Sequence, residues 1–95
     1  MKAAVYHAPN DIRIEQVPIP QIQPDEALLR VHSACICGTD LRILHGSHSK
    51  YPPGTTRIPG HEVVGELVEV GTEVTSLQTG LRVLVAPNTS WLIGV

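Results

Sequence analysis

The chain has 95 residues, a formal net charge of −2 and an aromatic content of only 3%. This length allows one small domain at most. The lysines and arginines are scattered and aromatic residues are few, which argues against nucleic acid or an anionic membrane as partner. No apolar stretch approaches membrane-spanning length, and the apolar start is too short for a signal peptide, so we expect a cytoplasmic protein.

The first third of the chain predicts strands. Residues 2–6 are short and apolar, and residues 12–17 show a mixed but strand-like alternation of polarity. Three prolines within residues 18–24 forbid a helix and favour an extended segment at a sheet edge. The aliphatic run at residues 27–36 favours a core strand.

A single short helix follows. Gly38 ends the core strand, and Thr39 and Asp40 have side-chain oxygens suited to the start of a helix that runs to Leu44. Gly46 suits a left-handed residue at the helix end.

Beyond the helix the pattern returns to strands. Residues 47–59 are rich in proline and glycine and predict an irregular loop, whereas residues 63–70 alternate as a strand buried on at least one face. We expect a turn at 71–73 and a further strand at 81–86, and we assign no structure to the apolar tail at 89–95. Short strands between turn signals, with one short helix, indicate a mainly β fold of the small barrel or sandwich type.

The two cysteines are Cys35 and Cys37. A disulfide between them would close a tiny, strained loop, so we expect two reduced thiols. Two cysteines also exclude a structural zinc site made of four cysteines. We expect Cys35 to be a packed thiol.

Three residues could converge as a metal site. Cys37 lies where a strand gives way to a helix, and His61 and Glu62 lie directly before the strand at 63–70. Thiolate, imidazole and carboxylate suit zinc, and three protein ligands leave the open position of a catalytic site. Each residue also has a structural alternative: a buried thiol for Cys37, a hydrogen-bonded loop histidine for His61 and a solvated charge for Glu62.

The spacing of two motifs resembles a known family. The run 37–40, Cys-Gly-Thr-Asp, resembles the catalytic-cysteine motif of the zinc-dependent medium-chain alcohol/polyol dehydrogenases. The run 60–62, Gly-His-Glu, followed by Gly65, Gly71 and Val74, resembles the zinc signature of the same family. The resemblance runs over residues 1–88, which we expect to be an incomplete catalytic domain, and it excludes the tail at 89–95.

This resemblance implies a fold and a set of roles. It implies a partial GroES-like β-barrel with one short helix after the catalytic cysteine. Cys37 and His61 would be zinc ligands, and Glu62 would be a close neighbour that can also ligate the ion. Thr39 would pass a proton outward from the alcohol, and Asp40 would be the carboxylate that orients His61. Thr39 and Asp40 could instead act only as helix caps.

The chain departs from the family in three ways. Arg42 stands where the polyol branch often has a histidine of the proton relay, so that relay is in doubt unless His45 replaces it. We expect His45 and His48 otherwise to be surface residues. The family's remaining zinc ligand would lie beyond Val95. No dinucleotide-binding motif is present, so NAD(P) is expected only in the full-length family.

These observations leave two main hypotheses. The first is a fragment of a dehydrogenase that binds Zn²⁺ and acts on a small alcohol or polyol in the full-length family, but is inactive alone. The second is a stand-alone GroES-like module without metal or catalysis, which self-associates through exposed barrel edges. A zinc hydrolase with Glu62 as its base is a poor third reading, because the second histidine of such a motif is absent.

Overall fold

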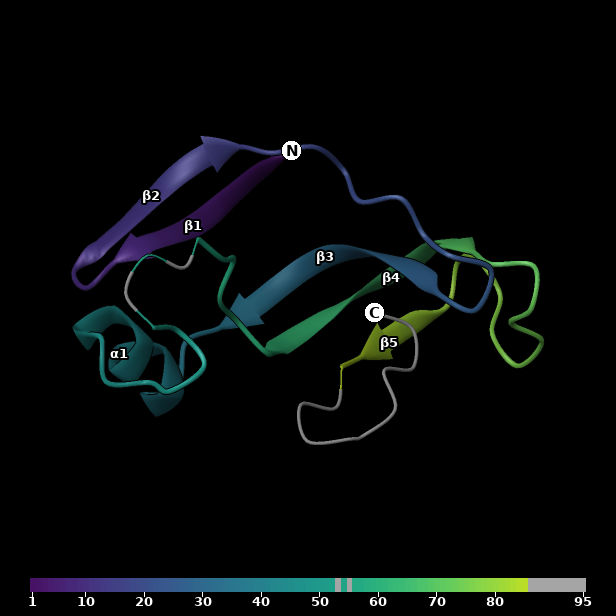
Figure 1. Ribbon diagram of the computed structural model, residues 1–95. Coiled ribbons are helices and arrows are strands. Elements are labelled where there is room, and N and C mark those ends of the chain that lie inside the picture. Colours follow the sequence, from purple (N-terminus) through teal and green to yellow (C-terminus); the bar gives the residue numbers. More distant parts are fainter. Residues whose placement is uncertain (53, 55, 86–95) are drawn as a thin grey trace. The chain divides into compact units, whose positions relative to one another are not determined.

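The computed structural model describes residues 1–52, 54 and 56–85, and this part of the chain is mainly β, as predicted (Figure 1). The elements are β1 (Lys2–Ala8), β2 (Asp11–Gln16), β3 (Ala27–Cys35), α1 (Gly38–His45), β4 (Glu62–Val70) and β5 (Arg82–Leu84). No helix among the described residues combines the length and apolar character needed to cross a membrane. The tail at 89–95 lies outside the described residues.

The chain divides into two compact units. The first comprises Met1–Ile19 and Ile36–Gly60, and the second comprises Pro20–Cys35 and His61–Val95. The first contains a two-stranded sheet, β1–β2, and the second a three-stranded sheet in the order β3-β4-β5. The described strands therefore form two open sheets.

The β1–β2 hairpin forms the first unit's sheet, and its buried residues, Val5 and Tyr6, lie on β1. Its antiparallel register pairs Lys2 with Gln16 and Tyr6 with Ile12, with an irregularity just before the turn. Asn10 in the turn has a φ of 59°, a left-handed conformation that asparagine tolerates better than most residues. Tyr6 is fully buried, so β1 provides the inner strand of this hairpin.

Helix α1 ends with the predicted left-handed Gly46, and its last residue is His45, one beyond the predicted Leu44. Gly46 has a φ of 81°, and its N–H donates to the carbonyl oxygen of Ile43. A Cβ at Gly46 would collide with the ring of Pro9, so both the conformation and the contact require glycine. The helix begins one residue earlier than the predicted Thr39, because Cys37 is the N-cap.

The predicted loop at 47–59 is tied to β1 rather than lying loose. The backbone N–H groups of Tyr6 and Arg57 each donate to the other residue's carbonyl oxygen. The ring of Tyr51 stacks edge-on against Tyr6 at 5.5 Å and against His48 at 5.7 Å. His48 is half-buried, with its ring against Tyr51.

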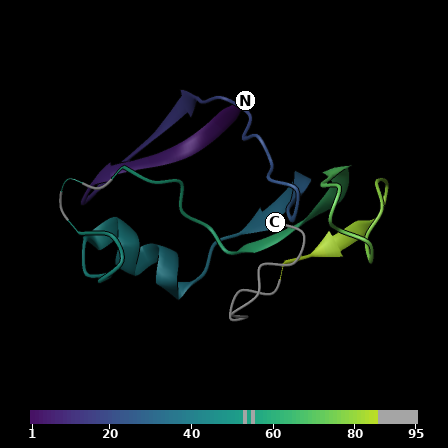
Figure 2. The same ribbon diagram turned by 45° about the vertical axis from the view of Figure 1, so that its right-hand side comes forward.

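In the second unit, β4 lies between β3 and β5 (Figure 2). Gly65 and Leu67, which share one face of β4, are buried, whereas Glu66 and Val68 on the opposite face are half-buried, which confirms a strand buried on at least one face. A Cβ on Gly65 would overlap the backbone carbonyl of Arg30 in β3, so the close approach of the two strands requires a glycine there. Gly71 is confined in the same way by the carbonyl oxygens of Gln23 and Pro24.

Two sequence expectations need correction. The second half of β3 is exposed, with Val31 at 55%, because the described residues place nothing over it; burial requires a facing element as well as an apolar strand. β5 is shorter than the predicted 81–86, and residue 86 lies outside the described residues.

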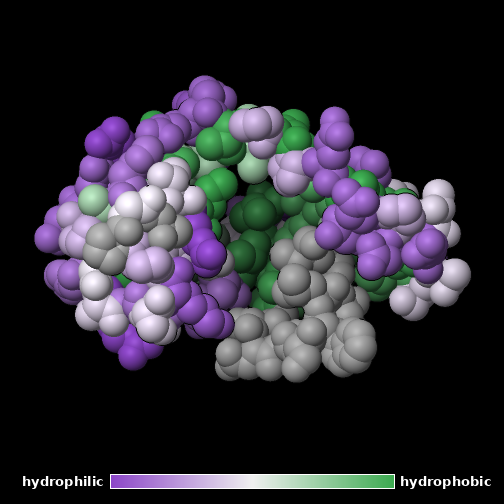
Figure 3. Space-filling view, in the orientation of Figure 1, coloured by the Kyte–Doolittle hydropathy of each residue, from purple (hydrophilic) through white to green (hydrophobic). Residues whose placement is uncertain are grey.

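The space-filling view shows hydrophobic residues over β3 and β4 (Figure 3).

Candidate metal centre

The candidate site lies at one end of the β3–β4 ladder. The last rung of that ladder pairs Cys35 of β3 with Glu62 of β4. Cys37 follows two residues after the end of β3, and His61 directly precedes β4. The antiparallel ladder therefore brings together two segments that are more than twenty residues apart in the chain.

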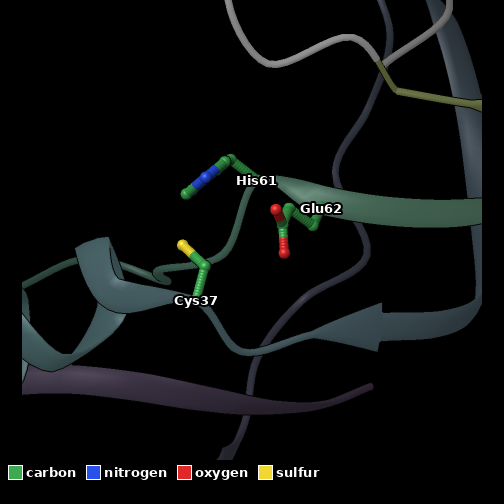
Figure 4. Close-up of side chains that lie close together, drawn as sticks. All are labelled: Cys37, His61 and Glu62. Carbon is green, nitrogen blue, oxygen red and sulfur yellow. The ribbon is translucent and has the colours of Figure 1, made fainter.

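Cys37, His61 and Glu62 converge as the sequence predicts (Figure 4). One ligand atom from each residue, the sulfur, a ring nitrogen and a carboxylate oxygen, lies within 4.8 Å of the other two. Two ligands bound to one zinc ion at about 2.0–2.3 Å lie at most about 4.6 Å apart, so this spacing is close to that of a bound set. Cys37 and His61 are half-buried and Glu62 is exposed, so the group is open to solvent on its Glu62 side.

Helix capping holds the backbone of Cys37. Its φ of −122° and ψ of 180° are extended, and its N–H donates to Oδ2 of Asp40 at 2.9 Å. The N–H groups of Asp40 and Leu41 donate to the carbonyl oxygen of Cys37. We missed this cap because cysteine is not a usual N-cap residue, although the acid three residues later is the sign of a capping box.

Asp40 has one carboxylate oxygen left over. Its Oδ1 is buried and has no hydrogen-bond partner among the described residues. A buried acceptor without a partner is costly, which indicates a role that the helix cap does not satisfy. Thr39 is half-buried in the first turn of α1. The roles of Thr39 and Asp40 toward a metal stay predictions.

The other candidate residues near the motif lie elsewhere. Arg42 and His45 are exposed on α1. His45 is the last helical residue, roughly 12 Å from Cys37 along the axis at 1.5 Å per residue. This separation argues against His45 as a replacement for the relay histidine. Cys35 is exposed, so our expectation of a packed thiol is wrong: the last rung of the ladder has nothing over it among the described residues.

Comparison with known proteins connects this geometry to a family. Residues 23–93 match the model of the alcohol dehydrogenase GroES-like domain. The chain is 41% identical over 84 residues to sorbitol dehydrogenase of Ovis aries, covering 88% of the chain and 24% of that protein. It is 42% identical over 91 residues to zinc-type alcohol dehydrogenase B of Aspergillus flavus, covering 95% of the chain and 21% of that protein. The chain thus spans about a quarter of the length of these relatives.

Solved structures agree with the sequence matches. Alcohol dehydrogenase TADH from Thermus sp. ATN1 superposes with a TM-score of 0.78 at 37% identity, and galactitol-1-phosphate dehydrogenase from Escherichia coli with 0.80 at 29% identity. Each match covers 88% of this chain and 24% of the other. The family match covers well over half of the chain, and it includes Cys37, His61 and Glu62. The chain therefore belongs to the GroES-like N-terminal domain of the zinc-type medium-chain alcohol/polyol dehydrogenases.

Proposed function

We propose that the chain binds Zn²⁺ through Cys37, His61 and Glu62 as part of the catalytic domain of an alcohol or polyol dehydrogenase. The observation that carries this proposal is the convergence of three zinc-type ligand atoms at the end of the β3–β4 ladder. The donor set fits the ion: thiolate and imidazole are strong zinc ligands, and a carboxylate completes three. Relatives named sorbitol dehydrogenase and zinc-type alcohol dehydrogenase support the same assignment.

The chemistry follows from the donor set and its surroundings. A bound zinc ion would supply a Lewis acid for the oxygen of a CH–OH group. Cys37 and His61 would hold the ion, and Glu62 would ligate it or lie beside it. Thr39, half-buried in the first turn of α1, would accept the proton of the alcohol and pass it outward. Asp40 would use its buried Oδ1 to orient His61, since ligating histidines usually donate to a carboxylate or carbonyl oxygen.

Turnover would require parts that the described residues do not provide. A dehydrogenase transfers hydride to NAD(P), and this chain spans about a quarter of its relatives. We therefore propose that residues 1–88 form an incomplete catalytic domain, inactive by itself. The substrate would be a small alcohol or polyol, as the names of the relatives suggest.

The first test is the zinc content of the 95-residue chain purified without chelator or added metal. We expect close to one zinc ion per chain, and a loss of that ion in His61→Ala because one of three ligands is removed. His45→Ala is the matched control, since His45 is an exposed histidine at the other end of α1. Equal zinc in His61→Ala and the unaltered chain would contradict the proposed site, as would zinc-free protein that takes up none from solution.

Exposed apolar side chains favour a second candidate function, association through open sheets. Ile36 is 84% exposed, Leu84 77% and Ile14 72%. Apolar side chains and sheet edges in such numbers invite self-association. In this case the chain would form a defined oligomer by light scattering, independent of metal, and His61→Ala would change neither its zinc content nor its mass.

A further inference from the structure

A second thiol lies beside the proposed ligands and has no role so far. Cys35 is exposed, and it is the cross-strand partner of Glu62 in the last rung of the β3–β4 ladder. Paired residues in an antiparallel ladder project their side chains to the same face, with Cβ atoms about 4.5–5.5 Å apart. The Cys35 thiol therefore begins on the same face as a carboxylate that already belongs to the three-residue group.

Cys35 also lies two residues from Cys37. The Cα atoms of alternate residues in an extended segment are roughly 6.6 Å apart, whereas the sulfur atoms of two thiolates on one zinc ion lie at most about 4.6 Å apart. Cys35 is outside the group whose ligand atoms lie within 4.8 Å of one another, but an exposed side chain changes rotamer on a picosecond-to-nanosecond timescale. Rotation about χ1 of Cys35 needs no change in the backbone ladder and displaces no packed neighbour, since residues 30–35 are exposed.

We propose that Cys35 supplies a second thiolate to the metal, so that the chain holds zinc by Cys35, Cys37, His61 and Glu62. This inference rests on the proposed zinc site. Three ligands leave one tetrahedral position, and a soft thiolate fills it more strongly than water. On binding, each thiol loses its proton to solvent. Because an alcohol would need this fourth position, it would have to displace the Cys35 thiolate to reach the metal.

Cadmium binding tests the number of thiolates directly. Cd²⁺ is a soft ion that takes the same ligands as Zn²⁺, and each Cd–thiolate bond adds to an ultraviolet charge-transfer band. We expect Cys35→Ser to retain one metal per chain with about half the band intensity, because one of two thiolates is removed. We also expect it to lower the zinc affinity on the order of tenfold or more in competition with a chelator.

Alkylation provides an independent readout. In the metal-free chain, iodoacetamide should modify Cys35, which is exposed. Saturation with Zn²⁺ should slow that modification, measured by mass spectrometry of the peptide, because a ligating sulfur is protected. Ser33→Ala, an exposed change on the same strand, should alter neither the band nor the affinity, and circular dichroism would check the fold of each variant.

The possible outcomes separate the inference from the proposal on which it rests. If Cys35→Ser leaves the band intensity, the zinc affinity and the metal stoichiometry unchanged while His61→Ala loses the metal, the second thiolate is refuted and the proposed site stands. The second thiolate is also refuted if iodoacetamide modifies Cys35 equally fast in the zinc-loaded chain and in the metal-free chain. If the unaltered chain binds neither ion, both proposals fail together.

Discussion

The middle of the β3–β4 ladder and its end serve different purposes. In the middle, Gly65 and Leu67 are buried, and Gly65 lies against the backbone of Arg30. At the end, Cys35 and Glu62 form the last rung and both are exposed. The packed rungs set the register, and the register then determines which side chains meet at the exposed rung. Reactive side chains can thus be positioned by a strand without being buried in it.

The largest effect is expected from a change that breaks the packed middle. Gly65→Ala introduces a methyl group that would overlap the carbonyl oxygen of Arg30, a backbone atom that cannot rotate away. We expect a loss of about 1–3 kcal/mol in the free energy of unfolding, measured by urea denaturation. Metal binding should weaken as well, because a distorted ladder no longer aligns Cys35 and Cys37 with Glu62.

Gly38→Ala is the matched control for that change. A Cβ at Gly38 meets nothing within 4 Å, and its backbone is not left-handed. Since alanine is a better helix former than glycine, we expect equal or slightly higher stability. A Gly65→Ala chain as stable as Gly38→Ala would mean that the close approach of β3 and β4 does not depend on glycine.

An intermediate effect on stability is expected at α1, the helix that follows the exposed end of the β3–β4 ladder. Asp40→Ala removes the acceptor for the N–H of Cys37, and the loss of such a cap costs about 1 kcal/mol of stability. If Asp40 also orients His61, zinc affinity should fall by a further 10–100-fold, measured by chelator competition. The two readouts separate the roles, because a cap alone would change the unfolding midpoint and leave the zinc affinity nearly unchanged.

Asp40→Asn sharpens this distinction. Asparagine keeps one carbonyl oxygen for the cap, so stability should be largely restored. It lacks the charge that a ligating histidine favours in its partner, so zinc affinity should recover only in part. Full recovery of both properties would contradict a role for the carboxylate charge at His61.

Local patterns predicted the site better than they predicted the packing around it. Cys37, His61 and Glu62 were predicted from their residue types, which suit zinc, and from the resemblance of the runs 37–40 and 60–62 to the motifs of one family. The exposure of β3 depends on whether another element covers it, which no pattern within residues 27–36 records. The contacts of Tyr51 with Tyr6 join residues that are far apart in the chain, and nothing in either local sequence indicates that pairing.

The smallest effect on stability is expected at the β1–β2 hairpin. Its exposed ion pair is a reference for the effects expected in the packed middle of the β3–β4 ladder and at its exposed end. The guanidinium of Arg13 donates two hydrogen bonds to Asp11, at 2.9 and 2.8 Å, and these hold the pKa of Asp11 below its ordinary value of 3.8. Because the folded-state pKa is lowered, the pair stabilises the fold above pH 3.8, and that contribution is lost as the pH falls through the lowered pKa. Arg13→Ala should return the pKa of Asp11 toward 3.8, followed by NMR titration of its carboxyl group, while the unfolding midpoint at neutral pH changes little because the pair is solvated. A large loss of stability at neutral pH would show that the hairpin, like the buried middle of the ladder, depends on each of its contacts.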